Sequence, residues 1–339
     1  MIVRKYLSLK GIFEFTGHHL YWLIAWMSLV TGVYYVTSWQ FIIIPWMPLT
    51  VIGTAVAFYA GFKNNQSYDR LWEARKIWGA MVNDSRKFAS MVKNFRSDEP
   101  GAEALDDLRK QVIYRNIAWL YQVREQLMEP TPWEHVGLGG PIGHFNRKRR
   151  ERNMGYFRPE LNELKERKYL SVSEERKLQH VNNKATQLLD MQTRDVQQLC
   201  QVNAINSFHQ IALQEIINSF HDGQGRADRI KRFPFPRKYA SFGFAFVCIF
   251  IFLLPFGLVG VFRDLKDGFI WLAIPVGVIV GWIYVAMEIV GDYSENPFEG
   301  LHNDVPMLSL IRNSEIDILQ MIGEKDLPQP IKPREGILL

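Results

Sequence analysis

The chain has 339 residues, of which 40 are Lys or Arg and 35 are Asp or Glu, and its mean hydropathy is close to neutral. That average would fit two or three soluble domains, but the apolar residues are concentrated toward the two ends, which excludes an ordinary soluble chain. Cys200 and Cys248 are the sole cysteines, so we expect neither a disulfide framework nor a thiolate metal site.

The first predicted element is a membrane hairpin over residues 15–62, which contain no Asp, Glu, Lys or Arg. A helix needs about 20 apolar residues to cross the hydrocarbon core, so this block is long enough for two crossings and a tight turn. The block is too long for a signal peptide and no small-residue cleavage site follows it, so we expect it to remain in the folded protein.

Residues 63–238 form a polar segment with no apolar run long enough to cross a membrane. Its apolar residues recur every three or four positions, which predicts helices and an all-α domain. The first of these helices prolongs the second span into water. Further helices are expected over 106–128, 173–203 and 204–220, with a Gly- and Pro-rich loop at 137–143 and a break at 222–225.

A second hairpin is expected from the uncharged blocks 239–262 and 268–287, which the charged turn 263–267 separates. Each block is about one bilayer long, so the chain is predicted to have four transmembrane helices in two hairpins. The tail 327–339 contains three prolines and is expected to lack a fixed structure of its own. The expected domains are 1–62 (N-terminal segment and first hairpin), 63–238 (cytosolic helical domain), 239–290 (second hairpin) and 291–339 (cytosolic C-terminal segment).

An even number of spans places both termini and the polar segment on one side of the membrane. Basic residues flank the membrane ends on that side, which the positive-inside rule makes cytoplasmic. They are Arg4, Lys5, Lys10, Lys63, Arg70, Arg75, Lys76, Arg232, Arg237 and Lys238. We therefore expect a multi-pass protein with cytoplasmic N and C termini and membrane lipids around its spans.

No motif supports an enzyme. The sequence lacks a glycine-rich phosphate loop, a paired-cysteine spacing, His-Glu-x-x-His and a nucleophile elbow, so we expect no catalytic residues, no cofactor and no metal site. The basic run 147–152 is compatible with nucleic-acid binding, but no recognition fold or aromatic platform accompanies it. A solvated loop, or one that touches acidic lipid headgroups, is the simpler interpretation.

Three residues of the second span form a candidate pore lining. Thr54, Phe58 and Phe62 are spaced by four, so they lie on one helical stripe that gives a hydroxyl ring and two aromatic rings around a shared axis. One four-helix protomer offers too little lining, so a channel requires an oligomer. The alternative is that Phe58 and Phe62 face lipid or a neighbouring helix. Small residues that permit close helix approach lie beside the stripe: Gly53, Ala57, Ala60 and Gly61.

Two motifs resemble signatures of a known family. Residues 61–75 read GFKNNQSYDRLWEAR, with Trp78-Gly79 just beyond, and residues 295–298 read ENPF, followed by NDVP at 303–306. In a two-plus-two arrangement of spans, these motifs resemble bacterial members of the bestrophin family over essentially the whole chain. The resemblance implies a homopentameric ion channel of the cell inner membrane that passes small monovalent ions through one central pore.

The resemblance also assigns the neck of the pore. The family's neck comes from three residues of the second span, and counting back from Arg70 places them at Thr54, Phe58 and Phe62. An apolar residue is usual in the family at the position of Thr54. A hydroxyl there should ease wetting at the outer end, which leaves Phe58 and Phe62 as the main hydrophobic barrier.

A second constriction, at the cytosolic exit, is implied by the same resemblance. An ungapped alignment through Gly225 and Pro236 places it at Phe208, with Ile205 and Ile211 as near alternatives.

Calcium activation is not expected. Animal bestrophins follow Asn-Pro-Phe with a run of acids that completes a calcium site, whereas residues 299–304 read EGLHND. Calcium prefers six to eight oxygen ligands, and Leu301 and His302 supply few.

The ion that passes is less strongly indicated. Phenyl edges turned toward the axis favour anions and phenyl faces favour cations. Asp69 and Glu73 could form cation-attracting rings, although an ion pair between Glu73 and a neighbouring Arg is the preferred interpretation. Because the motifs are bacterial, we lean slightly to monovalent cations. The alternatives are an anion (chloride) channel of the same architecture and a membrane-anchored scaffold or regulatory protein without a pore.

Three acidic residues share a face at the cytosolic end of the fourth span: Glu288, Asp292 and Glu295. We expect them to pair with basic residues that flank the membrane rather than to bind a metal. The expected partners are Arg4, Lys5, Arg237 and Lys238.

Overall fold

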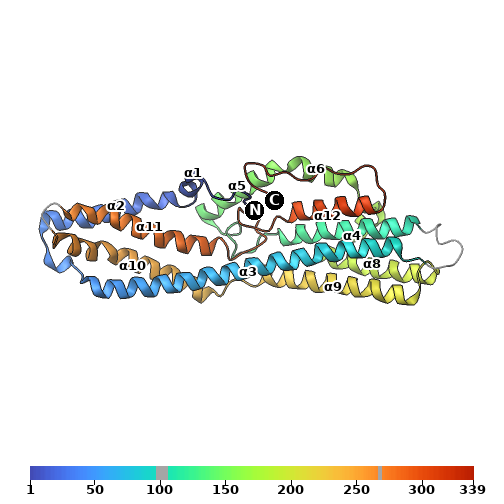
Figure 1. Cartoon of the computed structure of the whole chain (residues 1–339), viewed down its shortest axis with the longest axis horizontal. Coiled ribbons are helices and arrows are strands. Elements are labelled where there is room, and N and C mark those ends of the chain that lie inside the picture. The colour runs from blue at the N-terminus through green and yellow to red at the C-terminus, as the bar shows by residue number, and fades with distance from the viewer. Residues whose placement is uncertain (97–105, 266–268) are drawn as a thin grey trace. The chain divides into compact units, whose positions relative to one another are not determined.

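The computed structural model describes residues 1–96, 106–265 and 269–339, which form two compact units (Figure 1). The span unit comprises Arg4–Arg70 and Pro234–Asn296, and the polar unit comprises Met1–Val3, Leu71–Phe233 and Pro297–Leu339. Helix α3 (Trp46–Asn94) is continuous and contributes to both units, so the predicted extension of the second span is confirmed. Residues 266 and 267 of the expected charged turn lie outside the described residues.

The span unit contains all the long apolar helices. It begins with α1 (Leu9–Ile12) and the π-helical turn η1 (Phe13–Gly17). It continues with α2 (His18–Thr37), the 3₁₀ turn η2 (Gln40–Ile42), the first part of α3, α10 (Arg237–Arg263), the 3₁₀ turn η4 (Phe269–Leu272) and α11 (Ala273–Asp292). Among the described residues, four helical segments are long and apolar enough to cross a membrane, which confirms the two predicted hairpins.

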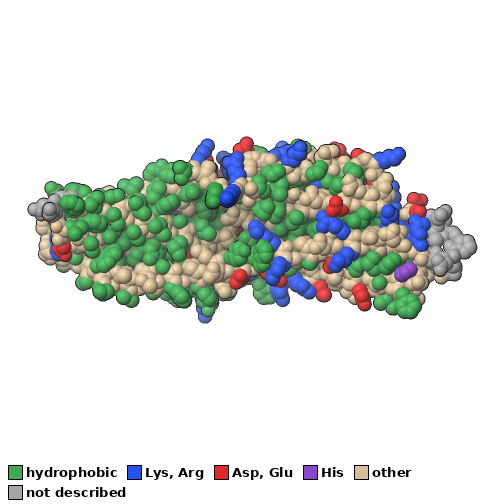
Figure 2. Space-filling view, viewed as in Figure 1, with side chains coloured by type: hydrophobic (Ala, Val, Ile, Leu, Met, Phe, Trp, Pro, Cys, Tyr) green, Lys and Arg blue, Asp and Glu red, His purple; other side chains and the backbone are tan. Residues whose placement is uncertain are grey.

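Glycines let the helices of the span unit approach closely. A Cβ atom at Gly277 of α11 would lie 2.7 Å from Sδ of Met27, and one at Gly281 would lie 2.9 Å from Cδ2 of Leu23. Met27 and Leu23 of α2 have no exposed surface, so they fill the space that these glycines leave. On the face shown in Figure 2, hydrophobic side chains cover this unit, whereas charged side chains gather over the polar unit.

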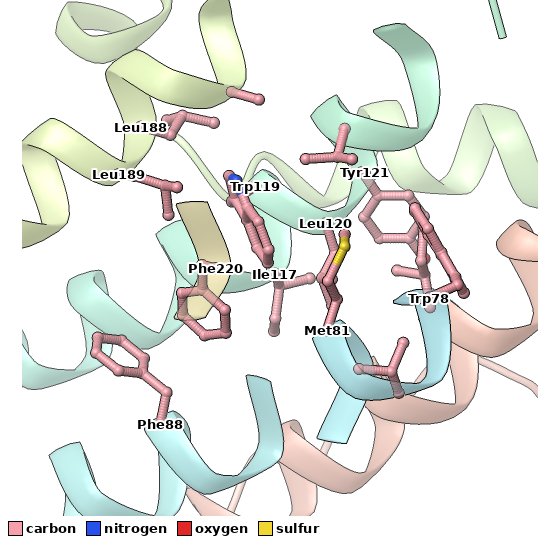
Figure 3. Close-up of a cluster of buried hydrophobic side chains, with 14 of the residues drawn as sticks. Trp78, Met81, Phe88, Ile117, Trp119, Leu120, Tyr121, Leu188, Leu189 and Phe220 are labelled. Carbon is pink, nitrogen blue, oxygen red and sulfur yellow. The ribbon is translucent and has the colours of Figure 1, made fainter. Parts of the chain in front are cut away.

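The polar unit is helical in all its described regular elements. It comprises the second part of α3, α4 (Asp106–Leu127), α5 (Gly140–Tyr156), α6 (Arg158–Arg167), α7 (Val172–Leu178), α8 (Lys184–Gln201), α9 (Ser207–Arg232) and α12 (Met307–Met321). The described residues form no strand, only isolated bridges at Ile2, Arg334 and Ile337, so the all-α prediction is confirmed. Figure 3 shows part of the core, where aromatic side chains of α3, α4 and α9 meet.

The break predicted at residues 222–225 is wrong, because α9 runs without interruption through both glycines. A Cβ atom at Gly223 would lie 2.5 Å from Cγ of Met81 on α3. The glycine therefore serves close helix packing rather than a turn. Gly225 has open space at the same position, so nothing forces the helix to end there either.

The single helix predicted over residues 173–203 is divided into α7 and α8. Ser171 and Glu174 form a capping box that begins α7, and Asn183 Oδ1 accepts a hydrogen bond from Thr186 N at 3.0 Å to begin α8. Each cap satisfies backbone N–H groups at a new helix start, which the apolar spacing alone does not reveal.

The predicted solvated loop around the basic run is also wrong, because residues 147–152 lie within α5. Gly139 caps this helix and a proline occupies its first turn, a position at which proline is well tolerated. Arg147 donates from Nη1 to the carbonyls of Val136 (3.1 Å) and Leu138 (2.8 Å), and Arg150 Nη2 donates to Met128 O at 2.5 Å. Arg147 and Arg150 therefore hold the segment that precedes α5.

The tail is ordered on the polar unit, contrary to expectation. Ile331, Ile337 and Leu339 are buried, and Ser309 N donates to Leu339 O at 2.8 Å. Leu338 N donates to Met1 O at 2.8 Å, so the two ends of the chain lie together. Buried apolar side chains outweigh the three prolines because a partner surface exists on α12 and the N-terminal residues.

Candidate pore-lining site

The predicted stripe lies on the face of α3 that its own protomer leaves open. Thr54 is exposed, and the exposed fractions of Phe58 and Phe62 are 79% and 47%. In the most apolar window of the α3 span only 17% of the residues are buried in the protomer, against 50% for α10. The three residues therefore face lipid, water or another subunit rather than the protomer's own helices.

The hydroxyl groups beside the stripe are already used within the helix. Thr54 Oγ1 donates to Thr50 O at 2.9 Å, and Thr50 Oγ1 donates to Trp46 O at 3.0 Å. Both protons bond to carbonyls one turn earlier, which leaves the hydroxyl oxygens as acceptors toward the open side. The phenyl rings of the next two turns present only carbon and hydrogen.

The opposite face of α3 is packed against α10 and α11. A Cβ atom at Gly53 would lie 2.8 Å from Cε2 of Phe250, and Tyr284 Oη donates to Gly53 O at 3.0 Å. Ala60, also predicted as a small contact residue, is 2% exposed, whereas Gly61 has nothing within contact distance of its Cβ position. Small residues therefore fix one face of α3 and leave the aromatic stripe on the other.

Lys63 forms a buried ion pair that the sequence interpretation missed. Its Nζ lies 2.5 Å from Oε1 of Glu288 on α11, and the two side chains are only 2% and 8% exposed. The expectation that Glu288 pairs with Arg4, Lys5, Arg237 or Lys238 is therefore wrong. The sequence does contain a signal for this burial. The spacing of Gly53, Ala60 and Lys63 places all three on one face of the helix, so Lys63 lies on the packed side.

Two further acidic residues have partners that can be compared with the predictions. Glu295 pairs with Arg237 Nη1 at 3.3 Å, as predicted. Glu73 pairs with Lys76 at 2.5 Å, one turn further along the same face of α3, whereas the predicted partner was a neighbouring Arg.

The segment after α11 folds around a buried carboxylate. Asp304 accepts backbone hydrogen bonds from Phe298 N, Gly300 N and Val305 N, each at 2.6 Å. Phe298 and Gly300 have positive φ angles of 76° and 78°, which turn their N–H groups inward. Burial raises the pKa of Asp304, although the three N–H donors favour its charged form. Backbone N–H groups thus satisfy the buried carboxylate of this segment.

Neighbouring side chains of this segment are held by nitrogen donors. Arg149 Nη2 lies 2.6 Å from Nδ1 of His302, and burial together with Arg149 and Arg152 lowers the pKa of His302 to about 4. His135 N donates to Glu299 Oε1 at 2.8 Å. Within the described ranges, no group of three or more His, Cys, Asp or Glu side chains is placed to hold a metal ion.

The second predicted constriction lies at the start of α9. Asn206 Oδ1 accepts from His209 N at 2.9 Å and begins the helix. Phe208 and Ile211 on its first turns are 82% and 59% exposed, whereas Ile205 is 2% exposed in the core. The side chain of Ile205 is therefore not at a surface that can line a pore.

The profile of the family described as Bacterial/Fungal Bestrophin protein matches residues 18–320. Three similar relatives are each named voltage-dependent anion channel-forming protein. The protein of Ralstonia nicotianae is 26% identical over 302 residues, covering 86% of this chain and 85% of its own length. That of Nostoc is 28% identical over 261 residues (77% and 71%), and YneE of Escherichia coli is 24% identical over 286 residues (84% and 80%).

Solved structures share the fold. A crystal structure of a bacterial bestrophin homologue from Klebsiella pneumoniae has a TM-score of 0.72 at 19% sequence identity, covering 91% of this chain and 98% of that one. A further crystal structure of a membrane protein has a TM-score of 0.73 at 18% identity, with coverage of 92% and 99%. Similarity at these identities establishes the arrangement of helices.

Proposed function

Because the chain belongs to the bacterial and fungal bestrophin family, we propose that it assembles into a homopentameric ion channel whose neck is lined by α3. Members of this family are ion channels rather than enzymes. Among the described residues a single protomer has four candidate spans. These are too few to surround an aqueous path, so the proposed channel requires an oligomer with one shared pore.

The exposed phenyl rings of α3 are the observation that supports this proposal best. Phe58 and Phe62 are large apolar side chains on the open face of α3, while the opposite face is packed on α10 and α11. Together with Thr54, the rings recur every four residues, which stacks them along one line.

The proposed neck works by dewetting. Two successive rings of phenyl groups make a narrow apolar passage in which a continuous water column is unfavourable, so an ion crosses when the passage widens or the rings rotate. The acceptor oxygens of Thr54 support water at one end of the passage. The barrier is therefore expected at Phe58 and Phe62.

We propose monovalent anions as the permeating ions, in place of the cations that the motifs alone favour. Three similar relatives are named as anion channel-forming proteins. Phenyl edges carry partial positive charge, and edges turned to the axis stabilise an anion. Cations are the second candidate, supported by Asp69, which is exposed two turns beyond Phe62 on the same face of α3.

A second constriction is proposed at Phe208 and Ile211. Both are exposed apolar residues on the first turns of α9, and Phe208 is the position that the resemblance to the family implies. The burial of Ile205 supports its removal from this set.

The protein is proposed to lie in a bacterial inner membrane with the polar unit and both termini in the cytoplasm. Met1–Val3 and the C-terminal residues belong to the same unit, which supports an even number of crossings. The membrane-flanking basic residues support the cytoplasmic side, and lipids cover the outer faces of the spans.

Flux through the purified protein in liposomes tests the proposal. We expect ion flux from the wild type and a several-fold higher conductance from the Phe58→Ala/Phe62→Ala double variant, because smaller side chains widen and wet the neck. Native mass spectrometry should give five subunits for both. A pore-free scaffold predicts no flux from either protein, and unchanged conductance in a normally assembled double variant contradicts the neck assignment.

The sign of the reversal potential under a salt gradient separates the two ions. A potential close to the anion equilibrium value supports the main proposal, and one close to the cation value supports the second candidate.

A further inference from the structure

The ion pair of Lys63 and Glu288 lies directly behind the proposed neck. Lys63 follows Phe62 in sequence, so its side chain leaves α3 about 100° around the helix axis from the phenyl ring. Its Nζ lies 2.5 Å from Oε1 of Glu288, and both side chains are more than nine-tenths buried. A full positive and a full negative charge are thus enclosed one residue from the narrowest predicted part of the pore.

Lys63 is the group that compensates the Glu288 carboxylate. The other oxygen, Oε2, has no hydrogen-bond partner among the described residues. A Cβ atom at Gly243 of α10 would lie 3.3 Å from Cε1 of Tyr59 and 3.5 Å from this oxygen. A Cβ atom at Gly291 would collide with Asn64 Oδ1. Because the chain packs closely at Gly243 and at Gly291, each charge of the pair has the other as its main partner.

Stability alone does not account for a pair of this kind. Well-packed apolar residues usually hold buried helices as well as an ion pair does, since desolvating both charges costs about what their attraction returns. Ionisable residues within spans generally mark ion pathways. Charges directly behind Phe62 can change the electrostatic potential in the proposed pore, because a low-dielectric wall screens their field only weakly.

We propose that Lys63 and Glu288 set the ion preference of the neck by cancelling each other's charge. This inference rests on the proposed function, since it requires a conducting neck at Phe62. With the pair intact, the wall is neutral and the phenyl rings decide which ion passes. Loss of one partner places an uncompensated charge behind every copy of Phe62.

Reversal potentials of single and double variants test the inference. Glu288→Gln leaves Lys63 unpaired, and we expect the anion-to-cation permeability ratio to rise on the order of tenfold. Lys63→Gln leaves Glu288 unpaired and should lower the ratio by a similar factor. The double variant Lys63→Gln/Glu288→Gln should return it to the wild-type value, because both charges are gone.

Two additional variants keep the result unambiguous. An unpaired buried lysine can lose its proton, so Lys63→Arg/Glu288→Gln is included because guanidinium stays charged. We expect its ratio to rise as in Glu288→Gln. The matched control is Glu14→Gln, which removes the partner of Lys10; this pair is 3.9 Å apart with side chains 67% and 85% exposed, so solvent screens it. No shift is expected there.

Opposite shifts from the two single charge changes, with cancellation in the neutral double variant, support the inference. A pair that acts only by holding the helices changes conductance or thermal stability without opposite shifts in reversal potential. Unshifted reversal potentials in conducting Glu288→Gln and Lys63→Arg/Glu288→Gln channels overturn this inference alone. Absence of flux from the wild type overturns the proposed function and this inference together.

Discussion

The two parts of α3 carry the same kind of aromatic residue in opposite environments, one exposed and one buried. Phe58, in the span unit, is 79% exposed, whereas Phe88, in the polar unit, has no exposed surface. Phe88 meets Phe220 of α9 edge to face, with ring centroids 5.6 Å apart. Nothing comparable among the described residues of the protomer covers Phe58. The helix is continuous through both residues, so whether each ring is buried depends on the surface that packs against it and not on the helix itself.

The comparison separates residues that stabilise the protomer by packing in its core from residues that can be covered only by lipid or another subunit. Phe88 is part of a core that also contains Trp78, Met81 and Trp119 (Figure 3). Phe58 contributes little to this protomer's own packing. Substitutions at the two positions should therefore affect different observables.

The largest expected effect is a loss of stability at the buried ring. Phe88→Ala should lower the free energy of unfolding by about 3–5 kcal/mol, since it removes buried apolar surface and leaves a cavity. Denaturant unfolding of the detergent-solubilised protein measures this. The matched variant Phe58→Ala should change stability by less than about 1 kcal/mol. Equal losses would mean that the two rings are not distinguished by packing within the protomer.

A smaller loss is expected where α9 lies against the polar part of α3. Gly223→Ala places a methyl group against Met81 and should cost about 1–3 kcal/mol through overpacking. Gly225→Ala, two residues away in open space, should instead stabilise the helix by about 0.5–1 kcal/mol. A thermal melt of both variants checks the pair, and similar shifts would contradict the close contact.

Acid should weaken the polar unit through His302. Because burial and Arg149 lower its pKa from 6.5 to about 4, the unfolded chain binds a proton between these values that the folded chain does not. Stability should therefore fall as pH drops from about 6.5 to 4, by about 1–2 kcal/mol once partial exposure is allowed for. His302→Gln should flatten this part of the stability profile. An unchanged slope in the variant would assign the acid sensitivity to other groups.

The smallest expected effect concerns calcium. The segment after α11 satisfies Asp304 with backbone N–H groups and contains Leu301, so removing calcium with a chelator should leave ion flux unchanged. The flux assay with chelator and with added calcium measures this. Activation by added calcium would show that the segment rearranges around an ion.

Local patterns are sufficient for much of the fold. The helix expected over residues 106–128 is observed as Asp106–Leu127, and the two hairpins follow from uncharged blocks of bilayer length. The four-residue spacing of Thr54, Phe58 and Phe62 is enough to place them on one face of a helix. These features depend on residues close in sequence, which is why the sequence reveals them.

Features that depend on distant residues are mispredicted. The glycines at 223 and 225 indicate a turn only as long as the contact with Met81 is unknown, and the proline-containing tail is fixed by Met1 and Ser309 far away in sequence. Flanking basic residues are the natural candidates to pair with Glu288, because nothing local shows that Lys63 turns toward α11.

By itself, the sequence determined the spans, their pairing, the helical polar segment and the aromatic stripe, because hydrophobicity and helical periodicity are properties of neighbouring residues. Only the tertiary structure decided which face of α3 stays open, which cation neutralises Glu288, and that Ile205 is buried while Phe208 is exposed. Those outcomes depend on which surfaces meet, and contact energies between surfaces distant in the chain arise only once the helices are packed.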